Sequence, residues 1–241
     1  MKLGRQIFPA FATALFVCVS ASAAFASANH TNSSYAQRKV ITGQFPIQSA
    51  CLMPTQGDLI KVGFKGPEDM SQESESWAKV LEAIVVDHLK DRGISITSAT
   101  NPLSTGASDD EINRVISQIQ QKFKSVSALM YVKPRDIAKS AYTLGDQVGM
   151  LPCSENSDIV VFVQGRGKVF TAGGPGDTAD LFITLADAKT GEIVALIQLY
   201  PDGNFLLAPY SCFGPGLDIE LLDMNIGSIP KKEKKTKKSG Q

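Results

Sequence analysis

The sequence contains little histidine and little cysteine, and both shortages limit the chemistry it can perform. Among 241 residues there are two histidines, His30 and His88, and four cysteines. Histidine is the usual proton carrier near neutral pH, but a lone histidine on a helix is more often packed or exposed than catalytic. The sequence has no C-x-x-C pair and no Cys/His cluster, which argues against a zinc site.

Motifs for nucleotide binding and for serine hydrolases are also missing. Residues 162–177 contain five glycines. Gly165 and Gly167 begin a G-x-G-x-x-G pattern, but Phe170 occupies the third glycine position and no helix start follows. The chain has neither the G-K-[ST] of a P-loop nor the G-x-S-x-G of a hydrolase elbow. The glycines therefore predict a bent strand and a hairpin loop rather than a phosphate site.

A long hydrophobic run occurs only at the N-terminus. Two basic residues precede the apolar stretch 7–19, and small residues lead to an A-x-A site at 26–28. This pattern predicts a cleaved signal peptide over residues 1–28, since the stretch is shorter than the roughly 20 residues of a membrane-spanning helix. A membrane anchor and lipidation at Cys18 are the less favoured alternatives. We expect a periplasmic or secreted protein that begins near Asn29.

The charge is balanced over the whole chain but not along it. The sequence has 24 basic and 24 acidic residues. Without the signal peptide and the tail, residues 29–230 keep 16 basic and 23 acidic side chains. The tail 231–241 is expected to be disordered and solvated, with attraction to an anionic surface as the functional alternative. It lacks the aromatic residues of nucleic-acid grooves, so no nucleic acid is expected. The tail lysines are Lys231, Lys232, Lys234, Lys235, Lys237 and Lys238.

Hydrophobic periodicity predicts a single α/β (α+β) domain over residues 58–230, after a flexible leader over residues 29–57. The expected order is β-α-β-α-α-β-β-β, a mixed sheet of about five strands with helices packed against it. A capping box at Ser108 and Glu111 starts the second helix, and Pro134 starts the third. The expected strands cover 59–64, 94–100, 158–170, 180–187 and 192–200, and the helices begin near 71, 108 and 134.

Two further patterns resemble a family of bacterial envelope proteins. One is A-x-x-L-G-x-x-x-G before the apolar run 159–163, and the other is D-x-x-T-G-E. Over residues 58–200 the layout resembles the α/β domain shared by the curli-secretion lipoprotein CsgG, the synthase activator LpoB and the N-terminal domain of TolB. The lipid-bearing cysteine of that family is absent, and residues 150–157 are inserted before the strand. The matching residues are Ala141, Leu144, Gly145 and Gly149, followed by 187–192.

The resemblance also implies how the cysteines pair. In an exported protein, two of the three cysteines left after cleavage are expected to be oxidised. In the family layout the first and third strands lie parallel and adjacent, so Cys51 and Cys153 emerge at the same end of the sheet. Cys212 is expected at the other end and free, unless residues 201–212 fold back across the sheet. The resemblance therefore implies a Cys51–Cys153 disulfide.

These observations predict an exported, non-enzymatic α/β module for binding or assembly in the cell envelope or periplasm. The expected partner is an envelope or extracellular protein, with no cofactor and no metal, and the family resemblance transfers no functional residue. Two alternatives stay open. The chain could be a secreted hydrolase that uses carboxylates in a pocket not visible from residue spacing, or a structural, stress-related secreted protein without a specific ligand.

Overall fold

The computed structural model describes residues 32–100, 108–171, 176–201 and 204–227. The predicted signal peptide and the basic tail with its lysines lie outside these ranges, as do residues 172–175 of the glycine-rich stretch. The predictions made for those segments stay predictions.

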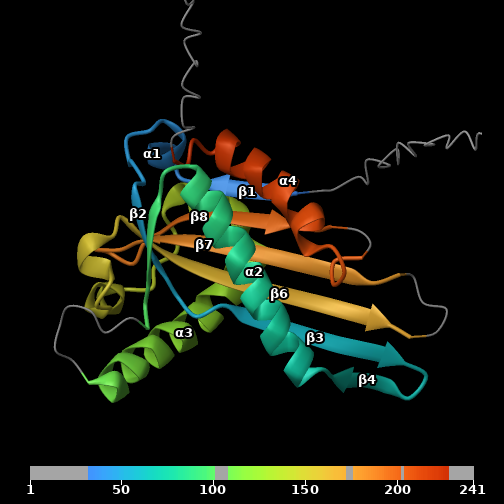
Figure 1. The fold of residues 1–241 in the computed structure, drawn as a ribbon. Coiled ribbons are helices and arrows are strands. Elements are labelled where there is room, and N and C mark those ends of the chain that lie inside the picture. Colours follow the sequence, from blue (N-terminus) through green and yellow to red (C-terminus); the bar gives the residue numbers. More distant parts are fainter. Residues whose placement is uncertain (1–31, 101–107, 172–175, 202–203, 228–241) are drawn as a thin grey trace, which may run out of the picture.

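The described residues form one mixed sheet with helices on its two faces (Figure 1). Its eight strands are β1 (Ser33–Ala36), β2 (Ser49–Leu52), β3 (Gln56–Gly63), β4 (Gly66–Asp69), β5 (Ser95–Ser98), β6 (Ile159–Phe170), β7 (Thr178–Asp187) and β8 (Ile193–Leu199). The α-helices are α1 (Arg38–Ile41), α2 (Ser71–Asp91), α3 (Asp109–Val132) and α4 (Pro209–Asp223). Three 3-10 helices are η1 (Pro134–Lys139), η2 (Asp146–Met150) and η3 (Ser154–Asn156). The α/β class is thus confirmed, whereas the expected five strands are too few for the described residues.

Strand β6 organises the sheet. The order β1-β8-β7-β6 is antiparallel throughout. On its other side, β6 pairs in parallel first with β2 and then with β3. Strand β5 continues the sheet beyond β2, and β4 continues it beyond β3. The sheet therefore divides at β6 into two arms, and the arm that contains β3 and β4 carries the clefts described below.

The apolar core lies on both faces of β6. Helices α2 and α4 cover one face and α3 lies on the other (Figure 1). Side chains alternate along a strand, so Val161 and Val163 pack toward α2 whereas Val160 and Phe162 pack toward α3. Burial on both faces explains the unbroken apolar run of this strand and confirms its central position.

The glycines of β6 permit close packing. The strand continues through Gly165 and Gly167, which lie opposite Leu181 and Ala179 of the antiparallel strand β7. A β-carbon on Gly167 would lie 2.9 Å from the ring of Phe205. The antiparallel pairing confirms the predicted hairpin for the described residues.

The flexible leader predicted over residues 29–57 is wrong from Ser33 onward, because this segment supplies β1, α1 and β2. Strand β1 pairs with β8, and β2 lies between β5 and β6. Gln37 Nε2 donates to the carbonyl of Ile193 at 2.8 Å, and Lys39 Nζ lies 2.6 Å from Glu192 Oε2. Each of the two strands has only four residues, too few for a recognisable alternation.

The third helix expected from Pro134 is also wrong beyond Ser140, which adopts a left-handed conformation with φ 56°. The chain then becomes extended and bonds to the turn between β7 and β8. The Leu144 N–H donates to the carbonyl of Gly191 at 2.7 Å, and the Ile193 N–H donates to the carbonyl of Tyr142 at 3.0 Å. In this segment, hydrogen bonds to the turn between β7 and β8 take the place of the hydrogen bonds within the expected helix. They also bring the two family-like sequence patterns into contact.

Helix α4 was not expected, because Pro215 and its neighbouring glycines are signals for a break. The helix is held by burial of Phe213 and Leu217 against the core. It is also fixed to α2, where His88 Nδ1 lies 2.8 Å from Asp218 Oδ1. His88 is thus a docking residue between helices. Within the described ranges, no helix is long and apolar enough to cross a membrane.

Candidate functional site

The disulfide implied by the family resemblance is present. Cys51 and Cys153 are bonded, with their Cα atoms 5.4 Å apart and a sequence separation of 102. Cys51 lies within β2, opposite Val160 of β6, rather than before the first strand. Cys212 is a free, half-buried thiol, and burial raises its pKa. This bond ties the beginning of the sheet to the segment that enters β6.

Two clefts flank strand β3. The first, here called the α2 cleft, has a volume of about 720 Å³ and lies between β3, the end of β4 and the N-terminal part of α2. The second, here called the α3 cleft, has a volume of about 450 Å³ and lies between β3, β6 and the C-terminal half of α3. Both volumes are in the range of small-molecule sites. Gln56 and Asp58 contribute to both clefts.

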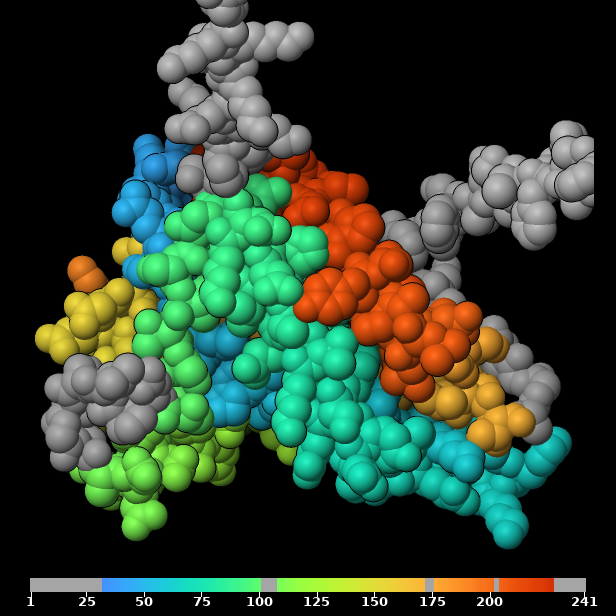
Figure 2. Space-filling model, in the orientation of Figure 1, coloured from blue at the N-terminus to red at the C-terminus, as the bar shows by residue number. Residues whose placement is uncertain are grey.

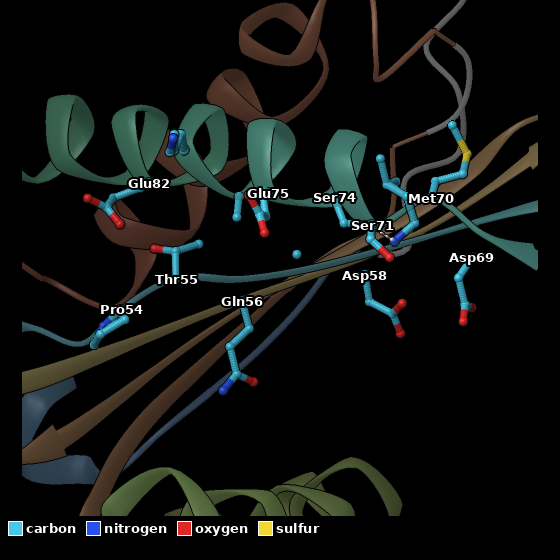
Figure 3. Close-up of a pocket in the computed structure, with 14 residues that line it drawn as sticks. Pro54, Thr55, Gln56, Asp58, Asp69, Met70, Ser71, Ser74, Glu75 and Glu82 are labelled. Carbon is cyan, nitrogen blue, oxygen red and sulfur yellow. Dashed lines mark hydrogen bonds between the residues drawn. The ribbon is translucent and has the colours of Figure 1, made fainter. Parts of the chain in front are cut away.

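The α2 cleft is rich in carboxylates, which β3 divides into two pairs. Glu75 and Glu82 project from α2 toward the strand, whereas Asp58 and Asp69 point away from the helix (Figure 3). A pair of catalytic carboxylates must flank one reacting bond. Across this cleft, β3 separates the helix pair from the strand pair. The described residues also contain no group of three or more His, Cys, Asp or Glu side chains that could hold a metal ion.

The floor of the α2 cleft is fixed by backbone contacts. The Ser74 hydroxyl accepts a hydrogen bond of 2.9 Å from the Leu59 N–H. A β-carbon on Gly57 would lie 2.6 Å from the Ser74 carbonyl oxygen. The first turns of α2 therefore pack directly on β3. Gly57 lies where helix and strand come closest, and a larger residue would collide with the helix there.

The α3 cleft lies on the part of the sheet that α3 leaves open. Helix α3 packs on Phe162 through Phe123, with ring centroids 4.3 Å apart. Beyond this contact the parallel register places Gln56 opposite Gln164 and Asp58 opposite Arg166. The two-residue alternation puts these four side chains on the α3 side of the sheet. The exposed Lys168 continues this row of side chains along β6.

We call the α3 side of the sheet beyond Phe162 the open face. Its residues are Gln56, Asp58, Gln164, Arg166, Lys168 and Asp180.

An aromatic cluster supports Arg166 on the open face. Its Cζ atom lies 5.3 Å from the ring centroid of Tyr131 and 5.7 Å from that of Phe182. The two rings lie 4.3 Å apart, and Tyr200 meets Phe182 edge-on at 6.2 Å. Stacking of a guanidinium on aromatic rings is favourable and restricts its orientation. The charged group of Arg166 is therefore held in place although the residue is exposed.

A chain of hydrogen bonds runs from α3 across the cleft. Tyr131 Oη donates to Gln164 Oε1 at 2.7 Å, and Gln164 Nε2 donates to Gln56 Oε1 at 2.8 Å. Burial raises the pKa of Tyr131 to about 12, although the nearby charge of Arg166 lowers it. The phenol thus remains a donor at physiological pH. This chain orients the amide of Gln56 with its NH₂ group away from Gln164.

Charges alternate across three strands of the open face. Asp58 of β3, Arg166 of β6 and Asp180 of β7 occupy one register row. Burial raises the pKa of Asp180 above its usual value, and the positive charges of Arg166 and Lys168 oppose that rise. The row therefore combines a partly desolvated carboxyl with a cation that is held by aromatic rings.

Sequence reasoning did not identify the open face. The available signal was the alternation in residues 164–168, where polar side chains alternate with Gly165 and Gly167, followed by the polar and aromatic positions Asp180 and Phe182. Alternation of this kind is typical of a strand with one face toward solvent. The two glycines instead favour the interpretation as a bent strand.

The sequence matches no protein family model and no curated protein. Among solved structures, it resembles the PelC dodecamer of Paraburkholderia phytofirmans with 10% identity and a TM-score of 0.39, covering 82% of this chain and 98% of that chain. A leucine-to-methionine variant of the same dodecamer has 10% identity and a TM-score of 0.38, covering 78% of this chain and 96% of that chain. At these values the similarity is confined to the general course of the chain and assigns neither a ligand nor an assembly state.

Proposed function

We propose that this protein is an exported, non-enzymatic α/β module of the cell envelope or periplasm that binds a partner through the open face. The observation that carries the proposal is the exposed Arg166, which lies over the rings of the half-buried Tyr131 and the buried Phe182 beside the α3 cleft. Arginine and aromatic side chains are enriched at the centres of protein interfaces. A partly uncovered sheet surface with these residues is suited to recognition.

Export is supported by two independent features. The N-terminal sequence has the pattern of a signal peptide. The Cys51–Cys153 disulfide is the kind of bond that persists in oxidising compartments such as the periplasm. The resemblance of the sequence to envelope assembly proteins agrees with both.

The arrangement of the acidic groups favours binding over catalysis. The carboxylates of the α2 cleft are divided between two sides of β3, as Figure 3 shows for Glu75 and Asp58. On the open face, Asp58 and Asp180 lie on opposite sides of Arg166 in the register. The arginine therefore separates the two carboxylates. Alternating charges of this kind fix the register and orientation of a partner.

The test is affinity capture from envelope extracts with the mature protein, residues 29–241. Three forms are compared: wild type, Arg166→Ala, and Lys61→Ala as the matched control. Lys61 is an exposed cation on β3 that lies opposite Val169 and hence on the other face of the sheet. We expect a stoichiometric partner with wild type and Lys61→Ala, and its loss with Arg166→Ala. Absence of any stoichiometric partner, together with turnover in a substrate panel, would contradict the proposal.

One observation favours the alternative of a carboxylate hydrolase. Asp69 of β4 lies opposite Ile60 of β3, so Asp58 and Asp69 are diagonal neighbours on one face of the sheet. Diagonal neighbours have Cβ atoms about 7 Å apart, a separation at which two carboxylates can flank a bond. If this alternative holds, Asp58→Asn and Asp69→Asn should each abolish turnover of a glycoside or ester panel, whereas Glu155→Asn should leave it unchanged.

A further inference from the structure

Arg166 is held in place but forms no ion pair with a described carboxylate. Its register neighbours are Asp58 and Asp180, yet neither carboxylate forms an ion pair with it, and no described side chain hydrogen-bonds to its guanidinium. The guanidinium lies over the rings of Tyr131 and Phe182, and these contacts use none of its N–H donors in hydrogen bonds to described side chains. A planar fork of N–H donors matches the two oxygens of a carboxylate or phosphate.

Other donors line the same cleft. Lys124 from α3 supplies a second positive charge, and it takes part in no ion pair among the described residues. The hydrogen-bond chain from Tyr131 leaves the Gln56 NH₂ group without a partner in the described structure. Against these donors the lining has one carboxylate, that of Asp58. The lining of the α3 cleft thus has two cations and one carboxylate, and Asp180 lies beside Arg166 outside the lining.

The size of the cleft limits the ligand. Its volume is about 450 Å³, and its walls come from three separate elements, β3, β6 and α3. Sites of roughly 300–1,000 Å³ accommodate small molecules. The aromatic floor beside the polar donors suits a ligand that carries an anionic group on a compact body.

We propose that the α3 cleft binds the carboxylate or phosphate group of a small ligand, with Arg166 making the bidentate contact and Lys124 and Gln56 adding single contacts. This proposal rests on the proposed function, because it names a ligand class for the same open face. The ligand is a small molecule that carries an oxyanion group, and the test below distinguishes a carboxylate from a phosphate.

The experiment is a titration of the isotope-labelled mature protein followed by NMR, with the side-chain Nε–H signal of Arg166 as the readout. Three matched probes are used: glucuronate, glucose 6-phosphate and neutral glucose. We expect a saturable shift of the Arg166 signal with at least one of the two anions and none with glucose. A shift with glucuronate alone assigns the carboxylate source, and a shift with glucose 6-phosphate alone assigns the phosphate source.

Variants make the assignment specific, and their affinities are read from the backbone amide signals of Gln56, Gly165 and Tyr131, which line the cleft in every form. Arg166→Ala should weaken anion binding about tenfold or more, as expected for loss of a charge-assisted bidentate contact. Arg166→Lys should bind with intermediate affinity, because lysine keeps the charge but not the fork. Asp58→Asn should strengthen binding about threefold by removing the neighbouring negative charge, whereas Lys61→Ala should match wild type.

Two results would overturn the anion site. One is the absence of a saturable shift with both anions, and the other is equal affinity in wild type, Arg166→Lys and Asp58→Asn. Melting curves identify any variant that is unfolded. If Arg166→Ala is unstable, the affinities of Arg166→Lys and Asp58→Asn test the anion site instead. If the anion titration fails while partner capture still depends on Arg166, the anion site is rejected and the binding module stands.

Discussion

Gly165 of β6 lies directly beneath Trp77 of α2, with no space for a side chain between them. A β-carbon on Gly165 would be 2.8 Å from two ring atoms of Trp77 and would also collide with Leu81. The glycine therefore sets the distance between helix and sheet. Its role is packing, which explains this glycine of the stretch without any bound phosphate.

The first prediction concerns this contact. Gly165→Ala should lower the free energy of unfolding by about 1–3 kcal/mol, the usual cost of overpacking a core. Gly149→Ala is the control, because the nearest atoms to its β-carbon would be 3.7 Å away. Urea denaturation of both variants provides the measurement. Equal losses of stability would show that close packing at Gly165 is not the cause.

The second prediction concerns the disulfide. Replacing Cys51 and Cys153 together by serine should reduce the free energy of unfolding by about 2–5 kcal/mol. Cys212→Ser should have little effect, since Cys212 is a free thiol. Denaturation with and without reductant tests the stability, and peptide mapping without reduction tests the pairing. A linked peptide that contains Cys212 is the result that would refute it.

The third prediction is a pH dependence at Glu192. Burial acts to raise the pKa of Glu192, but the hydrogen bond from Lys39 and the other hydrogen bonds to the carboxylate outweigh it, so the pKa lies below its ordinary value of 4.5. Folding therefore favours the ionised form. This stabilisation is present above the unfolded pKa and is lost as the pH falls through the lower, folded pKa.

The measurement is a set of melting temperatures between neutral pH and pH values below 4.5. Glu192→Gln should reduce the melting temperature at neutral pH and flatten its decline in acid. Glu155→Gln, at an exposed position of η3, is the control and should follow the wild-type curve. If the melting temperature of Glu192→Gln fell with decreasing pH as it does in wild type, the Lys39–Glu192 pair would not contribute to the stability of the fold.

Elements with long periodic patterns were predictable from sequence. The apolar stripe of α2 is buried as expected at Trp77, Leu81 and Ile84, and Ser108 caps α3 by accepting the Glu111 N–H. Strands β6, β7 and β8 were also found near their predicted positions. The four-residue strands β1 and β2 were missed because their pairing partners are supplied by distant segments. Helix α4 was missed because its stability comes from packing on α2 and not from local preference.

The candidate site was less accessible to sequence reasoning. The disulfide followed from the family resemblance, which implied that two strands are parallel neighbours. The open face is the surface that the C-terminal half of α3 leaves uncovered beyond its contacts with Phe162, Gln164 and Phe182. That limit is set by tertiary packing, and the cross-strand row of Asp58, Arg166 and Asp180 is set by register. Neither is encoded in the spacing of residues along the chain.

Partner contact at the open face is tested most directly by site-specific photo-crosslinking in the native host. A photoreactive residue is placed at Lys168, on the open face, or at Lys61, on the opposite face (Figure 2 shows the molecule from the side of α2 and α4). The account predicts one discrete adduct from position 168 and none from position 61. An adduct from position 61 alone, or none from either position, would contradict it.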